Sequence, residues 1–445
     1  MKILFISLGC DKNLADSEEM LGLLTAGGHE ITDDETQADA IVINTCCFIK
    51  DAKEESVETI LEMAEYKKTG SCHALIVTGC MAQRYQKEII EEVPEVDAVL
   101  GTTSYGDIVK ALEEAVAGNH FEEFRDIDYL PDTGSKRVLT TGGHFGYLKI
   151  AEGCDKHCTY CIIPKLRGKF RSVPMERLIA RAEDMAEQGV KELILVAQET
   201  TVYGKDLYGK KSLHILLKKL CEIRGIRWIR ILYCYPEEIY DELIETIRDE
   251  KKICHYLDIP IQHASDRILK RMGRRTSKQE LIDIVGKLRK EIPDIVLRTT
   301  LITGFPGETE EDHEELKEFV DEMEFDRLGV FTYSPEENTP AAEMADQVPE
   351  EVKEERRDEL MELQQEISYD RGQDRIGQEL LVMIEGKVAD ESAYIGRTYG
   401  DAPKVDGYIF VQTGELLMTG DFAKVRVTGA LEYDLIGVLS DEYTE

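Results

Sequence analysis

The sequence predicts an α/β protein built from three consecutive parts: a parallel α/β domain, an incomplete barrel of six βα units, and a small antiparallel β-barrel. Apolar strand-like runs alternate with helical segments on both sides of residues 118–142, which predicts the first two parts. From residue 376 the pattern changes to short strands separated by turn residues, which predicts the third. A length of 445 residues suits two to four domains.

The first predicted domain covers residues 1–117. Its expected strands are 3–8, 40–43 and 74–77, and its expected helices are 17–24, 53–66 and 83–92. Each strand is followed by a cysteine, in order Cys10, Cys46 and Cys80. Because the carboxyl ends of parallel strands share one edge, we expect these thiols to converge on one metal site. Cys47 directly follows Cys46, so the residues alone leave open which of the two is the ligand.

The second predicted domain covers residues 143–375, after a segment 118–142 that lacks periodicity and is interpreted as a linker. Its expected strands alternate with helices such as 174–188 and 278–291, and a charged amphipathic helix over 349–372 should pack on the barrel. Six such units predict an incomplete βα barrel with its chemistry at the carboxyl ends of the strands. The expected strands are 147–151, 192–197, 228–232, 256–259, 296–302 and 328–332.

Three cysteines form Cys-x3-Cys-x2-Cys on a loop directly after the strand 147–151: Cys154, Cys158 and Cys161. Structural zinc usually takes four ligands, and an electron-carrying [4Fe–4S] cluster takes four thiolates. A cluster held by three thiolates leaves one iron open for a substrate or cofactor. A zinc loop or a chance grouping is the alternative interpretation.

Candidate cofactor contacts follow the later strands. Gln198 and Glu199 come after the second strand, and Gly304 and Gly307, after the fifth, would let backbone approach a ligand closely. Arg298, within the fifth strand, suits a ligand carboxylate, with a structural salt bridge as the alternative. His263 has no second histidine near it and is not assigned as a ligand. No side chain is assigned as a catalytic acid or base.

Composition bears on partners and location. Acidic residues outnumber basic ones by 89 to 54, a net charge of −35, and the last 70 residues carry thirteen acidic and five basic residues, a net of −8. Proteins that bind a phosphate backbone usually present a basic face, so this balance favours a basic protein partner over nucleic acid, with general solubility as the alternative explanation.

Eleven cysteines without a secretory signal favour a reducing, cytoplasmic location. No run of eighteen apolar residues exists, so no membrane span is expected. Four cysteines share no spacing with the others and are interpreted as small buried apolar residues: Cys72, Cys221, Cys234 and Cys254.

The cysteine loop, with Tyr160 before its last cysteine, resembles the signature of radical S-adenosylmethionine (SAM) enzymes. That resemblance implies that Cys154, Cys158 and Cys161 hold a [4Fe–4S] cluster whose open iron binds SAM. One electron from an external donor would then cleave SAM to a 5′-deoxyadenosyl radical. Tyr160 would lie near the adenine, and the segment with Gly304 and Gly307 would pack against the cofactor.

Across nearly the whole chain, the order of motifs resembles the methylthiotransferase family. The matching stretches are 7–13, 44–46, 77–84, the cysteine loop and 303–308. The resemblance implies a second [4Fe–4S] cluster held by Cys10, Cys46 and Cys80, which favours Cys46 over Cys47. It also implies an external sulfur source and a tail domain of the TRAM type over residues 376–445.

Members of this family differ in substrate. Some modify adenosines of tRNA, and one branch modifies the β-carbon of an aspartate in the small-subunit ribosomal protein S-twelve. Residues 9–13, Gly-Cys-Asp-Lys-Asn, resemble that branch, and the acidic charge complements a basic ribosomal protein. We therefore expect methylthio transfer to that aspartate. A tRNA adenosine methylthiotransferase is the close alternative, and a non-catalytic two-cluster electron carrier is a third hypothesis.

Overall fold

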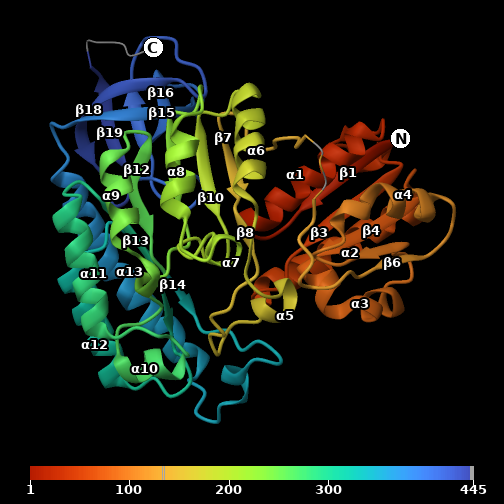
Figure 1. The fold of residues 1–445 in the computed structure, drawn as a ribbon, viewed down its shortest axis with the longest axis horizontal. Helices are drawn as coiled ribbons and strands as arrows, with labels where there is room; N and C mark the ends of the chain where they lie inside the picture. Colours follow the sequence, from red (N-terminus) through yellow and green to blue (C-terminus); the bar gives the residue numbers. More distant parts are fainter. Residues whose placement is uncertain (133, 135, 441–445) are drawn as a thin grey trace.

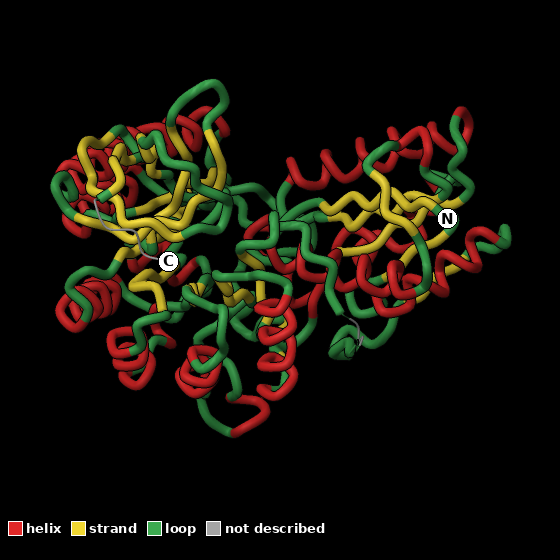
Figure 2. Tube along the Cα trace, turned by 90° about the horizontal axis from the view of Figure 1, so that it is seen from above, coloured by secondary structure: helices red, strands yellow, loops and turns green. Residues whose placement is uncertain are grey.

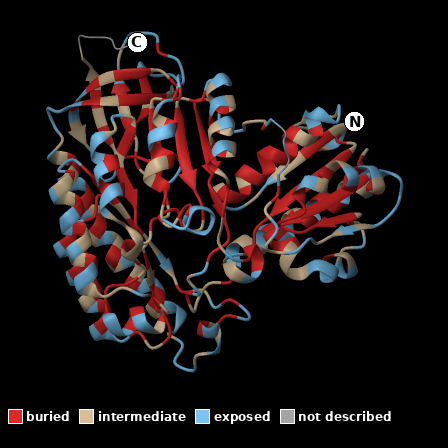
Figure 3. Cartoon of the chain, viewed as in Figure 1, coloured by how far each residue is buried: buried red, intermediate tan, exposed pale blue. Residues whose placement is uncertain are grey.

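The computed structural model describes residues 1–132, 134 and 136–440. Positions 133 and 135 of the predicted linker and 441–445 of the predicted tail domain lie outside the described residues. Figure 1 shows an amino-terminal α/β domain beside a larger sheet-and-helix domain, with the tail packed on the latter. Strands of both sheets are buried, and exposed residues lie mainly on the outer faces of the helices (Figure 3).

The amino-terminal domain is a six-stranded parallel sheet in the order β2-β1-β3-β4-β5-β6. Its three predicted strands are confirmed as β1, β3 and β4 at the centre. The other three have only three residues each, too few for periodicity to reveal, and β6 lies inside the segment predicted as a linker. The strands are β1 (Lys2–Ser7), β2 (Glu30–Thr32), β3 (Ala40–Thr45), β4 (Ala74–Gly79), β5 (Ala98–Leu100) and β6 (Phe121–Glu123).

The helices of this domain are α1 (Asp11–Ala26), α2 (Lys50–Thr69), α3 (Cys80–Glu92) and α4 (Ile108–Val116). The first three confirm the predicted helices, but α1 begins six residues earlier than expected. Its first turn is polar, so the apolar pattern does not mark it. Residue Cys10 is the N-cap of α1, and Cys80 is the first residue of α3. Two predicted ligands therefore stand where a strand turns into a helix.

The second domain is an open six-stranded parallel sheet in the order β14-β13-β12-β11-β10-β7. Its helices form an arc outside the strands (Figure 2). All six predicted strands are confirmed: β7 (Phe145–Lys149), β10 (Glu192–Val196), β11 (Trp228–Ile231), β12 (Ile253–Asp258), β13 (Val296–Thr303) and β14 (Arg327–Thr332). The main helices are α6 (Met175–Glu187), α8 (Leu213–Cys221), α9 (Asp241–Asp249), α11 (Lys278–Glu291) and α12 (Glu310–Met323).

The tail is a closed five-stranded barrel in the order β15-β16-β17-β19-β18. All five predicted strands are present: β15 (Glu379–Lys387), β16 (Ala393–Thr398), β17 (Ile409–Gln412), β18 (Phe422–Ala430) and β19 (Leu435–Leu439). The barrel is not wholly antiparallel as predicted, because β17 and β19 pair in parallel. The chain reverses into β18 and reverses again, so β19 runs in the direction of β17.

The tail is joined to the barrel by buried charges and rings. Arg397 of β16 contacts Glu192 of β10 at 2.7 Å, and neither side chain is exposed. Phe422 of β18 packs edge-on against Trp228 of β11, with ring centroids 4.8 Å apart. The predicted charged helix is confirmed as α13 (Glu350–Gln373), which packs on β14 and α12. Within the described residues, no helix is long and apolar enough to cross a membrane.

Candidate functional site

The Cys154–Cys161 loop leaves β8 (Ala151–Glu152) and runs into the short helix α5 (Ile163–Arg167). Gly153 begins the loop at φ +76°, and a Cβ there would lie 2.1 Å from the Lys169 carbonyl oxygen, so only glycine fits. The tip is fixed from outside, because the Thr159 N–H donates to the Met272 carbonyl at 2.9 Å. The loop is therefore an ordered structure that presents its thiols in a set arrangement.

The three loop thiols differ in exposure. Cys154 and Cys158 are buried and Cys161 is partly buried. Burial raises the pKa of Cys154 to about 11 and that of Cys161 to about 12. Such thiols become thiolates when a bound cation stabilises the charge, so metal loading should release protons. Their chemistry fits a cationic iron–sulfur group.

Among the described residues, no three His, Cys, Asp or Glu side chains are close enough to hold a single metal ion. A four-iron cluster makes a different demand, because each thiolate binds a separate iron at its own corner. Thiols that do not converge on one point therefore still fit such a cluster.

Gln198 and Glu199 lie beside this loop after β10, and each has a buried oxygen without a hydrogen-bond partner. Gln198 donates from Nε2 to Glu152 Oε1 at 3.1 Å, which leaves its own Oε1 unsatisfied. Glu199 accepts from Thr201 through Oε1, and its Oε2 stands 3.7 Å from Lys156 Nζ. Two buried acceptors without donors fit a ligand that carries N–H groups, as the amino group of SAM does.

Burial raises the pKa of Glu199 to about 7, although Thr201 and Lys156 oppose this and Glu238 and Glu237 add to it. A carboxyl whose pKa is higher in the folded than in the unfolded state contributes stability below the unfolded pKa, near 4.5, and loses it as pH rises through 7. We expect Glu199→Gln to become more stable relative to the unsubstituted protein between pH 4.5 and 8, by roughly 3 kcal/mol.

Thermal unfolding of SAM-free protein across this pH range measures the effect. Glu238→Gln is the matched control, because hydrogen bonds from Lys156 and Lys211 outweigh burial and lower the pKa of Glu238. The stabilising contribution of Glu238 is complete above its unfolded pKa, near 4.5, and is lost only below that pH. Glu238→Gln should therefore keep a nearly constant stability difference from the unsubstituted protein over this range. Equal trends for the two variants would contradict the assignment for Glu199.

Tyr160 and the two predicted glycines are placed differently. Tyr160 packs edge-on against Phe305, with centroids 6.4 Å apart, and so touches the segment that contains Gly304. A Cβ at Gly304 would lie 2.1 Å from Lys353 Cγ, and one at Gly307 would lie 2.4 Å from Asp346 Oδ2. Both glycines are therefore closely approached by side chains of the protein, whereas the sequence predicted a close approach to a ligand.

Arg298 is the third residue of the eight-residue β13 and lies opposite Asp258, the last residue of β12. Its guanidinium contacts Asp258 at 2.9 Å and Asp406 of the tail at 3.2 Å. Arg298 therefore forms the salt bridges of the alternative interpretation, and its role as a cofactor contact stays a prediction. His263, not assigned as a ligand, is buried and accepts from the Ser265 N–H at 3.0 Å.

Cys10, Cys46 and Cys80 lie together at the carboxyl edge of the amino-terminal sheet, as expected. Gly9 has a φ of +87°, and a Cβ there would lie 2.8 Å from Cys46 Sγ. Burial and the neighbouring thiols of Cys80 and Cys10 raise the pKa of Cys46 to about 12. Cys10 is exposed, whereas Cys46 and Cys80 are buried. The thiols of Cys10 and Cys80 are thus close enough to raise the pKa of Cys46, as expected for ligands of one group.

Cys47 occupies a different environment from Cys46. Its side chain is fully buried in the apolar cluster around Ile41, Ile43 and Val77. Burial raises the pKa of Cys47 to about 12, with contributions from Cys80 and Cys46 and opposition from Arg84. Of the two cysteines, Cys46 is the one that lies against Gly9, the residue before Cys10.

The two cysteine sets meet at α5. Arg167 at its end donates to Cys80 Sγ at 3.4 Å and to Asn13 Oδ1 at 3.0 Å. The same guanidinium pairs with Asp16 at 2.7 Å and with Glu152 at 3.3 Å. Figure 1 shows α5 between the two domains. Because Arg167 lies only six residues after Cys161, the loop of one set is tied directly to a thiol of the other.

We expect Arg167→Met to destabilise the protein by about 3–5 kcal/mol, since it leaves the buried carboxylates of Asp16 and Glu152 with Lys149 as the remaining basic partner. The midpoint of thermal unfolding of cluster-free protein measures this. Arg357→Met is the control, because Arg357 is partly exposed and pairs with its neighbour Asp358, so its effect should stay within about 0.5 kcal/mol. Equal shifts for the two variants would contradict the role of Arg167.

Several residues around the loops were not predicted from the sequence. Arg167 has partners 87 and 151 residues away, so no spacing identifies it. Tyr235 lies with its hydroxyl 3.8 Å from Cys158 Sγ, and Arg274 stacks 4.3 Å from the centroid of its ring. The sequence signal that could have identified Tyr235 is the pair Tyr233 and Tyr235 directly after β11. Catalytic and binding residues of such barrels usually lie at the carboxyl ends of the strands.

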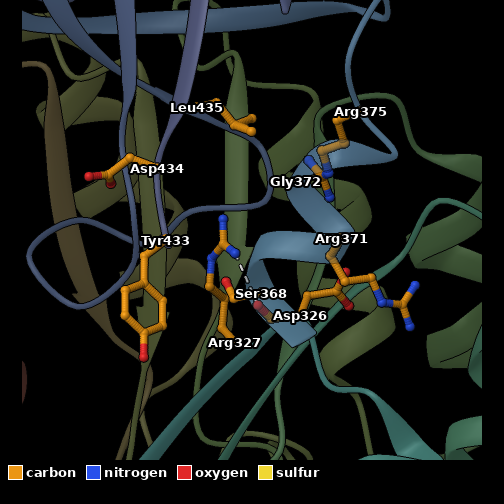
Figure 4. Close-up of a pocket in the computed structure, with 9 residues that line it drawn as sticks. All are labelled: Asp326, Arg327, Ser368, Arg371, Gly372, Arg375, Tyr433, Asp434 and Leu435. Carbon is orange, nitrogen blue, oxygen red and sulfur yellow. Dashed lines mark hydrogen bonds between the residues drawn. The ribbon is translucent and has the colours of Figure 1, made fainter. Parts of the chain in front are cut away.

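A pocket with an empty volume of about 280 Å³ lies elsewhere, between the end of α13, the start of β14 and the turn before β19 (Figure 4). Two of its three arginines have acidic partners: Arg327 contacts Asp401 and Arg371 contacts Glu324 at 3.4 Å. The lining therefore serves to join the tail to the barrel. The residues shown are Asp326, Arg327, Ser368, Arg371, Gly372, Arg375, Tyr433, Asp434 and Leu435.

Three family models match consecutive parts of the chain. An uncharacterized protein family, UPF0004, matches residues 2–101, the radical SAM superfamily matches 148–320, and the TRAM domain matches 376–439. These matches coincide with the α/β domain, the open barrel and the closed tail barrel.

Curated relatives match nearly the whole chain. The ribosomal protein uS12 methylthiotransferase RimO of Lachnoclostridium phytofermentans is 66% identical over 437 residues, which is 98% of this chain and 99% of the relative. The protein of the same name from Pelotomaculum thermopropionicum is 52% identical over 438 residues, with coverage of 98% and 99%.

A similar solved structure is that of TsrM, a radical S-adenosylmethionine methyltransferase from Kitasatospora setae, with cobalamin and a [4Fe–4S] cluster bound. Its TM-score is 0.56 at 14% identity, over 77% of this chain and 74% of that chain. At this identity the likeness shows the fold alone.

Proposed function

Because the chain belongs to the ribosomal protein uS12 methylthiotransferase family, we propose that it transfers a methylthio group to the β-carbon of an aspartate in uS12, the ribosomal protein S-twelve. The observation that carries this proposal is the meeting of two three-cysteine sets at α5, where Arg167 joins the loop of one to Cys80 of the other. A transferase that builds a sulfur group and inserts it at carbon needs two such centres side by side. An electron carrier would not need the two unsatisfied acceptors beside the loop.

Six cysteines would hold the two groups. Cys154, Cys158 and Cys161 would bind a [4Fe–4S] cluster with one iron open to SAM, and Cys10, Cys46 and Cys80 would bind a second. When bound and reduced by an external donor, the first would supply a 5′-deoxyadenosyl radical from one SAM. The second would hold sulfur from an external source, and another SAM would donate the methyl group to that sulfur. A radical is required because no side chain is basic enough to deprotonate an unactivated C–H bond at neutral pH.

The residues beside the loop would orient SAM. Glu199 Oε2 and Gln198 Oε1 are buried acceptors without donors, suited to the amino group of SAM. Tyr160, packed on Phe305, would present its ring near the adenine, and Gly304 and Gly307 shape the backbone next to it. Burial of these groups excludes water, which protects a reactive radical from side reactions.

Hydrogen transfer from the substrate tests this proposal. The reaction would contain uS12 in small ribosomal subunits, carrying aspartate deuterated at the β-carbon, with SAM, sulfide and reductant in the absence of oxygen. We expect deuterium in the 5′-deoxyadenosine product. Aspartate deuterated at the α-carbon is the control and should give none. Deuterium from the α-carbon, or from neither position, would contradict the proposed site of reaction.

A further inference from the structure

Lys12 differs from the other buried lysines of the described chain. Three lysine residues are buried: Lys12, Lys149 and Lys353. Lys149 pairs with Asp16 and Glu152, and Lys353 pairs with Glu350 at 2.9 Å. Lys12 is 8% exposed, yet no carboxylate of the described residues lies within ion-pair distance of its ammonium. Burial opposes the charge of Lys12, but Tyr233, Cys10 and Asp11 outweigh burial and raise its pKa, so the ammonium stays charged. The Asp11 carboxylate accepts from the Tyr233 hydroxyl at 3.3 Å and forms no ion pair with Lys12.

The ammonium of Lys12 is held on an aromatic ring instead. Its Nζ stands 3.3 Å from the centroid of Tyr233, a residue of the barrel domain. A ring occupies one side of an ammonium, which has three N–H donors, so donors remain for another acceptor. Tyr233 is itself constrained at φ +60°, with its N–H donating to Asp258 at 3.0 Å and its carbonyl accepting from the Thr200 N–H at 3.1 Å. Such strain is typical of functional positions.

This contact lies between the two cysteine sets. Lys12 is two residues after Cys10, in the first turn of α1. Tyr233 is two residues before Tyr235, whose hydroxyl lies 3.8 Å from Cys158 Sγ. An anion bound by Lys12 would thus lie near both the proposed sulfur-holding centre and the proposed SAM site.

We propose that the Lys12 ammonium, positioned by Tyr233, binds the carboxylate of the substrate aspartate. This rests on the proposed function, because that function makes an aspartate the group that is modified. The carboxylate is bonded directly to the β-carbon, so anchoring it fixes the reacting C–H bond between the two centres. A neutral amide or a nucleobase in the same place would offer the ammonium no negative charge, which makes Lys12 a specificity residue.

The competing explanation is that Lys12 only balances the negative charge of a cluster bound to Cys10. The two differ in what they predict for an uncharged substrate. Cluster balance requires no preference between aspartate and asparagine at the target position. Carboxylate binding requires a preference that disappears with the lysine charge.

The test measures the dissociation constants of cluster-loaded enzyme for small ribosomal subunits that carry uS12 with the target aspartate or with asparagine in its place. We expect the unsubstituted enzyme to prefer aspartate by about tenfold or more, and Lys12→Met to bind both within about twofold. Lys87→Met is the matched control, because Lys87 is exposed on α3 of the same domain, and it should keep the preference. Iron content and the reduction potentials of the clusters are measured in each variant.

A preference for aspartate that survives in Lys12→Met would overturn the proposal, whether or not the reduction potentials shift. Equal binding of both substrates by the unsubstituted enzyme would overturn it as well. If Lys12→Met fails to load iron, Lys12→Gln replaces it, and Lys12→Arg, which retains the charge, should keep the preference. Failure of the unsubstituted enzyme to modify uS12 at all is a separate outcome, because it would refute the proposed function.

Discussion

Replacement of Cys158 by alanine should reduce SAM cleavage to the level measured without enzyme. Cys158 is a buried thiol at the centre of a loop that offers only three, and a cluster with two thiolates loses its defined open iron. The measurement is 5′-deoxyadenosine formed by reconstituted enzyme with SAM and reductant, quantified by chromatography. Iron content should fall by about half, since the second set of cysteines is intact.

Cys221→Ala is the matched control for this loss. Cys221 is a partly buried free thiol at the end of α8, and it belongs to neither cysteine set. It should retain full cleavage with a stability loss of about 1 kcal/mol or less. Cleavage that persists in Cys158→Ala while Cys221→Ala behaves normally would refute the assignment of the loop.

Replacement of Cys46 by alanine should eliminate the methylthio product while 5′-deoxyadenosine is still formed. The loop that would cleave SAM remains complete, but the amino-terminal set loses the thiol that is influenced by both Cys10 and Cys80. The two products are measured in the same reaction, so cleavage and transfer are separated in one sample.

Cys47→Ala is the matched control for Cys46→Ala, because the two cysteines are adjacent in the sequence. Cys47 is buried among apolar side chains, so its loss should cost about 1 kcal/mol of stability and leave transfer intact. The reverse pattern, with transfer lost in Cys47→Ala and kept in Cys46→Ala, would identify Cys47 as the ligand.

Local patterns in the sequence sufficed for most of the fold. The six barrel strands and five tail strands are rich in apolar residues, and the buried residues of α11 show the expected periodicity. Short edge strands were missed because three residues carry no period, as β6 shows within the segment predicted as a linker. That segment also returns to the domain it leaves, where Arg137 forms a buried ion pair with Glu18.

The site was predictable where chemistry follows a motif and not where it depends on distant partners. The cysteines stand at strand ends, and both sets were therefore evident. Arg298 has a residue type suited to a carboxylate, but its place near the start of β13 depends on strand length and on Asp406, 108 residues away. Arg167 and Lys12 gain their roles only from contacts across the domain junction.

The charge argument for the partner also changes with the structure. Part of the acidity of the tail faces the barrel, because Asp401 pairs with Arg327 and Asp406 pairs with Arg298. These carboxylates stabilise the junction and are not available to a basic partner. The net charge of the tail therefore overstates its acidic surface, and the substrate assignment depends on the relatives and on the site.

Mass spectrometry of the product tests the central claim most directly. Reconstituted enzyme with SAM, sulfide and reductant would receive small ribosomal subunits in one reaction and unmodified tRNA in another. We predict a methylthio mass increase on one aspartate of uS12 and none on tRNA nucleosides. A methylthio group on a tRNA adenosine, with uS12 unmodified, would contradict the account.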